Sequence, residues 1–66
     1  MDNTFSIKLV ALRGEKSQTE VAAANGISAS ALAMYETGKR VPRDEIKRSL
    51  ANYYGVSVGG LFFNQE

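Results

Sequence analysis

Apolar residues recur along this chain three and four positions apart, which is the period of an amphipathic helix. No stretch alternates apolar and polar residues as a half-buried strand does. The pattern therefore predicts an all-α fold, a compact four- or five-helix arrangement around one core, in a single domain spanning residues 1–66. Glycine, proline or a turn pair separates the segments, at Gly14, Asn25-Gly26, Thr37-Gly38, Pro42, Gly55 and Gly59-Gly60.

Four helices and a short fifth are expected between these breaks. They lie at about residues 4–13, 17–25, 28–36, 43–54 and 58–63. Ser17 with Glu20 three residues later forms a capping box, and Ser28 is a favourable N-cap. The two adjacent glycines weaken the last helix. The apolar stripes predict the buried faces: Phe5, Leu9 and Leu12; Val21 and Ala22; Ile27, Leu32 and Tyr35; Ile46 and Leu50 with Tyr53 or Tyr54.

Residues 17–38 carry the functional signal. Two short amphipathic helices are joined by Asn25-Gly26-Ile27-Ser28, a tight turn with glycine near its start. This is the organisation of a helix-turn-helix at about residues 17–36, in which the second helix presents its N-terminal face to the DNA major groove. Ala22 is small where the helices approach, and Ile27 fills the corner between them. The residues left pointing outward are Ala29, Ser30, Ala33 and Met34.

The run SQTEVAAANGISASALAMYETGKRVP, followed by LANYYGVSVGGLF, resembles the Cro/repressor-type (xenobiotic-response-element-like) helix-turn-helix family. The shared features are a Ser/Thr-Gln start, a Val-Ala pair, Gly-Ile-Ser, a Glu-x-Gly end, a following proline and a closing Gly-Val-Ser. The resemblance covers about residues 9–63. It implies a DNA-binding regulator of transcription.

The resemblance also implies roles for particular residues. Gln18 is expected to touch a phosphate and brace the recognition helix, and Arg13 and Glu36 are expected to pair between the first and third helices. Thr37, Lys39, Arg40 and Arg43 match a loop that contacts the DNA backbone. The expected DNA-binding residues are Ser17, Gln18, Ser28, Ala29, Ser30, Ala33, Met34, Thr37, Lys39, Arg40 and Arg43.

The distribution of charge adds a basic segment to this picture. Residues 39–48 hold five cations and two carboxylates, a net charge of +3, and the rest of the chain has a net charge of −2. On charge alone this segment is interpreted as a solvated helix face. Next to the helix-turn-helix pattern it fits the footprint of an anionic partner.

Composition excludes several classes of chemistry. The chain has no cysteine and no histidine, so a disulfide scaffold, a thiol nucleophile and the usual zinc or imidazole sites are excluded. No catalytic carboxylate pair stands out, and we expect no enzyme activity, cofactor, metal site or small-molecule ligand. The apolar runs are too short to span a membrane, and no signal-peptide pattern opens the chain. We expect a cytoplasmic protein of bacterial or phage origin.

Two functional hypotheses follow. The first is a sequence-specific regulator, a repressor, with the helix at about residues 28–36 in the major groove. The second is a protein-interaction module, an antirepressor or adaptor, on the same fold. Ala29, Ala33 and Met34 support the second because they cannot hydrogen-bond to bases. Direct readout would then rest on thymine methyl groups, on Ser30 and on DNA shape. The basic segment favours the first.

A homodimer is expected under the first hypothesis, because one recognition helix reads only a few base pairs. The C-terminal segment is the expected contact. Leu61, Phe62 and Phe63 cannot all point into one small core, so at least one aromatic ring should be available to a second copy.

Overall fold

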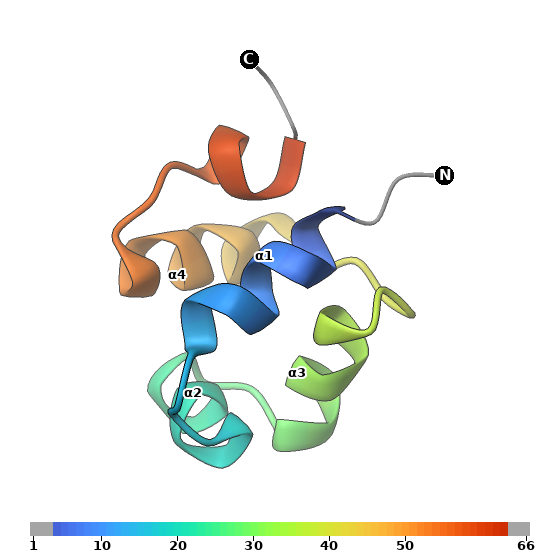
Figure 1. Cartoon of the computed structure of the whole chain (residues 1–66), viewed down its shortest axis with the longest axis vertical. Helices are drawn as coiled ribbons and strands as arrows, with labels where there is room; N and C mark the ends of the chain where they lie inside the picture. The colour runs from blue at the N-terminus through green and yellow to red at the C-terminus, as the bar shows by residue number, and fades with distance from the viewer. Residues whose placement is uncertain (1–3, 64–66) are drawn as a thin grey trace.

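The computed structural model describes the backbone of residues 4–63 and the side chains of residues 5–62, and within this part of the chain it contains no strand. The prediction of an all-helical fold is therefore confirmed (Figure 1). The elements are α1 (Thr4–Arg13), α2 (Gln18–Ala24), α3 (Ala29–Glu36), α4 (Asp44–Tyr54) and a π-helical turn, η1 (Gly59–Phe63).

Two serines begin the second and third helices as the sequence predicts. The Ser17 hydroxyl accepts a hydrogen bond from the Glu20 amide at 3.0 Å, and the Ser28 hydroxyl accepts one from the Ala31 amide, also at 3.0 Å. Each serine is thus an N-cap that satisfies one of the amides left without a partner at a helix start. Each helix begins one residue later than the pattern alone placed it.

One core unites the helices. α1 packs against α3 and η1, and α2 packs against α3 (Figure 1). The positions predicted to be buried contribute to this core, apart from Leu12. Its buried apolar residues are Phe5, Leu9, Val21, Ala22, Leu32, Tyr35, Leu50, Ala51 and Leu61.

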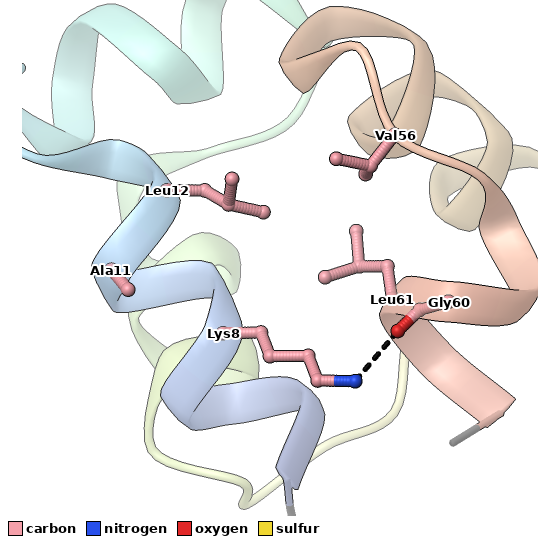
Figure 2. A pocket seen from close by; sticks show the side chains of 6 residues that line it. All are labelled: Lys8, Ala11, Leu12, Val56, Gly60 and Leu61. Carbon is pink, nitrogen blue, oxygen red and sulfur yellow. Dashed lines mark hydrogen bonds between the residues drawn. The ribbon is translucent and has the colours of Figure 1, made fainter. Parts of the chain in front are cut away.

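Leu12 is a correction to the predicted stripe of the first helix. Its side chain is 36% exposed, whereas Phe5 and Leu9 are buried. Position 12 lies on the flank of α1, facing Val56 and Leu61, and a pocket stays open between α1 and that segment. The segment that contains Val56 and Leu61 therefore leaves the Leu12 side chain partly exposed (Figure 2).

The last element is a π-helical turn and not the α-helix expected at residues 58–63. The Ser57 hydroxyl accepts a hydrogen bond from the Gly60 amide at 3.0 Å, and the Leu61 amide donates to the Ser57 carbonyl. A Cβ atom at position 60 would lie 2.9 Å from the Ser57 hydroxyl oxygen, so glycine permits this close approach. The turn buries Leu61.

Candidate nucleic-acid interface

The α2–turn–α3 unit is held by its own backbone and by the core. The Ile27 amide donates to the Ala22 carbonyl at 3.0 Å, which closes the turn after α2. Gly26 has φ +69°, a left-handed conformation that ends a helix without the steric penalty of a Cβ atom. Ala22 is buried where α2 meets α3, and Ile27 packs against the core. The unit is therefore the predicted pair of helices joined by a tight turn.

The outer face of α3 carries small and apolar groups. Leu32 and Tyr35 are buried, which fixes the rotation of the helix, so Ser30 and Met34 are exposed. Ala29 and Ala33 are half-buried beside them. Among these four side chains the Ser30 hydroxyl is the hydrogen-bonding group. The face can make apolar contacts and one polar contact.

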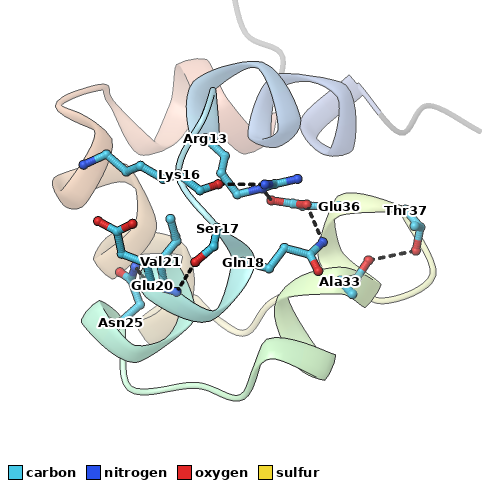
Figure 3. Close-up of polar contacts among 10 residues, drawn as sticks. All are labelled: Arg13, Lys16, Ser17, Gln18, Glu20, Val21, Asn25, Ala33, Glu36 and Thr37. Atoms are coloured by element: carbon cyan, nitrogen blue, oxygen red, sulfur yellow. Dashed lines mark hydrogen bonds and ion pairs between the residues drawn. The ribbon is translucent and has the colours of Figure 1, made fainter.

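Glu36, the last residue of α3, lies at the centre of a polar network (Figure 3). The Arg13 Nε atom donates to its Oε2 at 2.7 Å, and the Gln18 Nε2 atom donates to its Oε1 at 2.8 Å. Its side chain is 3% exposed. The hydrogen bond from Arg13 to Glu36 raises the pKa of the guanidinium above its ordinary value, so Arg13 carries its charge at physiological pH. The expected Arg13–Glu36 pair is present and ties α1, α2 and α3 together.

Gln18 braces α3, because its amide bonds directly to Glu36 at the end of that helix. A side-chain amide has two N–H donors, and one of them is used here. The second donor remains for an anion next to α2. The brace and a phosphate contact are therefore compatible at this residue.

The segment after α3 folds back against the end of that helix. Thr37 donates its hydroxyl to the Ala33 carbonyl at 3.0 Å (Figure 3), and the Lys39 amide donates to the Met34 carbonyl at 2.9 Å. Lys39, Arg40 and Arg43 are exposed, and their side chains form no hydrogen bond or ion pair with any residue in the described part of the chain. Three exposed cations therefore follow α3 in the chain, and the backbone amides of Lys39 and Arg40 bond to the Met34 carbonyl of that helix.

The basic segment does not form one continuous patch. The Lys47 ammonium lies 5.8 Å from the centroid of the Phe62 ring, a cation–π contact. Lys47 and Arg48 line a shallow pocket with Asp44 and Val58, between α4 and the C-terminal turn. The charge thus divides into a group after α3 and a group beside η1. Sequence spacing alone did not show this division.

Asn25 and Ser49 are structural residues that the sequence analysis missed. Asn25 is buried, its Nδ2 atom donates to the Val21 carbonyl at 2.8 Å, and its Oδ1 atom accepts from the Ser49 hydroxyl at 2.6 Å. This pair ties the end of α2 to α4. The sequence analysis assigned Asn25 to a turn pair with Gly26, because no local signal reveals a hydrogen-bond partner 24 positions away.

The residues of the expected C-terminal contact occupy different environments. Leu61 is buried in the core, and Phe62 is half-buried, with its ring centroid 5.8 Å from that of Phe5. The side chain of Phe63 lies outside the described residues.

Neither a metal-ligating cluster nor a membrane-spanning helix is found in the described part of the chain. It contains no group of three or more acidic, histidine or cysteine side chains that could hold a metal ion. None of its helices combines the length and apolar character needed to cross a bilayer.

Comparison with protein families gives one result. A family model described as Helix-turn-helix matches residues 7–61, which include α2, the turn, α3 and α4. No curated protein and no solved structure matches the chain.

Proposed function

Since the chain belongs to the Cro/repressor-type helix-turn-helix family, a family of DNA-binding regulators, we propose that it is a sequence-specific repressor of transcription. It places α3 in the major groove of double-stranded DNA. One observation carries this proposal: the exposed face of α3 is flanked by cations that have no partner among the described residues. A helix of this kind fits the major groove, and free cations bind the phosphates beside it.

The groups around α3 hold the protein on the DNA backbone. Lys39, Arg40 and Arg43 neutralise phosphates, and Thr37 lies beside them. On the other side, Ser17 and Gln18 at the start of α2 meet the opposite phosphates, with Gln18 using its free N–H. These contacts set the position of α3 and contribute affinity without reading sequence.

The outer face of α3 reads the bases. Ser28, Ala29, Ser30, Ala33 and Met34 lie along the helix where base edges pass. Because four of these side chains are small and Met34 is apolar, the readout rests on thymine methyl groups and on the Ser30 hydroxyl. DNA shape contributes at positions that the helix does not touch.

The regulator acts as a cytoplasmic homodimer of bacterial or phage origin, without catalytic activity, and residues 1–66 form its single domain. Two copies on half-sites about one helical turn apart multiply the weak readout of one helix. The proposed contact between the two copies includes the C-terminal segment with Leu61, Phe62 and Phe63.

A second function, a protein-interaction module, is favoured by one observation. The α3 face lacks an amide or guanidinium group that would pair with a base edge in two places. An antirepressor or adaptor would use this face to bind another protein. The cations beside α3 favour DNA.

Binding to a pool of random-sequence duplexes, measured as the salt concentration rises, tests the proposal. We expect log Kobs to fall linearly with log salt because phosphate neutralisation releases counterions. Arg40→Ala should reduce the slope by about 1 and weaken binding on all sequences. Met34→Ala should keep the slope and change the bases that are selected from the pool.

Arg48→Ala is the matched control, because it removes an exposed arginine on the Val58 side of α4. It should leave the salt slope unchanged. Salt-independent binding, or no binding at low salt, would reject the DNA-binding proposal and favour the interaction module. A change in base preference with Arg40→Ala and none with Met34→Ala would reverse the assigned surfaces.

A further inference from the structure

The two exposed side chains on the outer face of α3 have opposite characters. Ser30 and Met34 are four positions apart, so they lie on the same side of the helix in consecutive turns. Ser30 is exposed, and Met34 is 40% exposed. The thioether of methionine is flexible and polarisable, which suits contacts with apolar groups. The face therefore offers one hydroxyl next to one large apolar group.

The backbone that carries Met34 is fixed at several points. Its carbonyl accepts hydrogen bonds from the Lys39 amide at 2.9 Å, the Arg40 amide at 3.3 Å and the Thr37 hydroxyl at 3.2 Å. The single hydrogen of the Thr37 hydroxyl is shared between this carbonyl and that of Ala33, so it is not offered to a base edge (Figure 3). The Met34 side chain thus projects from a held position at the end of α3.

A pyrimidine presents two distinguishing groups in the major groove. The first is the group at position 4, which is the O4 acceptor in thymine and the N4 amino donor in cytosine. The second is the methyl group on C5, which thymine has and cytosine lacks. A cytosine that is methylated on C5, 5-methylcytosine, combines the methyl group of thymine with the N4 amino group of cytosine. A protein surface can therefore read the position-4 group, the methyl group, or both.

The side chains of α3 are suited to the methyl group and not to the position-4 group. A hydroxyl has one donor and two acceptor lone pairs and rotates to suit its partner, so Ser30 can donate to O4 or accept from the N4 amino group. α3 contains no amide or guanidinium side chain that would present a fixed set of donors to a base. The Met34 side chain gains apolar contact when a methyl group is present and loses it when the methyl group is absent.

We infer that the outer face of α3 reads the C5-methyl group of a pyrimidine and accepts 5-methylcytosine in place of thymine. The inference deepens the proposed function and rests on it, because α3 has to lie in the major groove. Met34 packs against the methyl group, and the short side chains of Ala29 and Ala33 let the base edges approach the helix. Methylation of a contacted cytosine therefore strengthens binding, and the affinity for a given site depends on the methylation state of its DNA.

Four versions of one base pair test the inference. In a duplex selected from the random pool, each T·A pair is replaced in turn by a uracil·A, a C·G and a 5-methylcytosine·G pair, and the Kd of the unaltered chain is measured for each duplex. At a contacted pair, removal of the methyl group should weaken binding about fourfold, both from thymine to uracil and from 5-methylcytosine to cytosine. Readout of the position-4 group would instead make thymine equal to uracil and cytosine equal to 5-methylcytosine.

Met34→Gln connects the methyl effect to α3. Methionine and glutamine have similar lengths, and the side chain is 40% exposed, so the fold should tolerate the change. The new amide replaces the apolar end of the side chain, so the fourfold ratio between methylated and unmethylated pyrimidines should fall to near one. Arg40→Ala is the matched control, because a phosphate contact carries no sequence information. It should weaken binding to all four duplexes by the same factor and leave the ratio unchanged.

Two outcomes would overturn the inference while DNA binding itself holds. In the first, thymine and uracil bind alike at every pair of the selected duplex, and so do cytosine and 5-methylcytosine. In the second, the methyl effect persists in full in Met34→Gln, which would place the contact on another surface. Failure of the proposed function is distinguishable from both, because the chain would then bind none of the four duplexes at low salt, and the inference would fall with it.

Discussion

The Tyr54 hydroxyl is a buried polar group without a hydrogen-bond partner among the residues that the structure describes. Burial, and secondarily the nearby Glu36 carboxylate, raise the pKa of this phenol above its ordinary value of 10.0. Its ring packs edge-to-face on Tyr53, with centroids 5.1 Å apart. The ring stabilises the fold, whereas the hydroxyl is a desolvated group that gains nothing in return.

Tyr54→Phe should therefore leave the free energy of unfolding unchanged or raise it by about 1 kcal/mol at neutral pH, because it removes a buried hydroxyl that has no partner. Since the folded-state pKa is raised, the unfolded chain loses this proton more readily. The contribution of this group to the free energy of unfolding of the unaltered chain is therefore fully present below about pH 10. It is lost as pH rises through the folded-state pKa. Tyr54→Phe should lack this part of the alkaline loss.

Urea unfolding of both chains at pH 7 and at several pH values above about 10 measures the difference. A Tyr54→Phe chain that is clearly less stable at pH 7 would show that the hydroxyl makes a stabilising interaction.

Two serines of the α3 region differ in role although they are two positions apart. The Ser28 hydroxyl accepts the Ala31 amide, whereas the Ser30 side chain is exposed on the outer face. Ser28→Ala should lower the free energy of unfolding by about 1 kcal/mol. Ser30→Ala should change stability little and alter base preference instead. Thermal unfolding separates the two effects, and equal losses of stability would contradict the assignment.

At the scale of elements, Glu36 joins three helices through one carboxylate. Arg13 comes from α1, Gln18 from α2, and Glu36 itself from the last turn of α3. Both carboxylate oxygens are hydrogen-bonded, which compensates for the loss of water around a buried charge. The orientation of α3 relative to α2 therefore depends on this network as well as on apolar packing.

Arg13→Ala should lower the free energy of unfolding by about 2–3 kcal/mol, because it leaves the buried Glu36 charge with Gln18 alone. The double variant Arg13→Leu with Glu36→Leu should be less destabilised than Arg13→Ala, since no unpaired charge remains in the core. Urea unfolding of the unaltered chain and both variants supplies the comparison. If the double variant loses more stability than Arg13→Ala, the prediction is wrong. The ion pair would then stabilise the fold by more than two leucine side chains can replace.

At the scale of the whole molecule, two surfaces have opposite characters. The loop after α3 carries exposed cations, and the outer face of α1 carries the exposed apolar side chains of Ile7 and Val10. The molecule measures about 30 × 23 × 22 Å, so both surfaces belong to one small body.

Local interactions are what the sequence by itself determined. The helices and their starts were predictable because helical periodicity and the Ser17 and Ser28 caps involve atoms within three or four positions of each other. The ordered motif from Ser17 to Gly38 predicted the α2–turn–α3 unit for the same reason. The Arg13–Glu36 pair was expected from the family resemblance and not from spacing.

Contacts between distant positions were decided by the tertiary structure. Ser49 bonds to Asn25, Lys47 packs on Phe62, and Leu12 stays partly exposed beside an open groove. Each depends on how far apart and at what angle two helices pack, and the helical period of either segment contains no information about that distance or angle. The exposure of the apolar side chains on the outer face of α1 was also decided by the tertiary structure. Periodicity places Ile7 and Val10 on one side of a helix. Only the packed fold shows that the described part of the chain leaves that side uncovered.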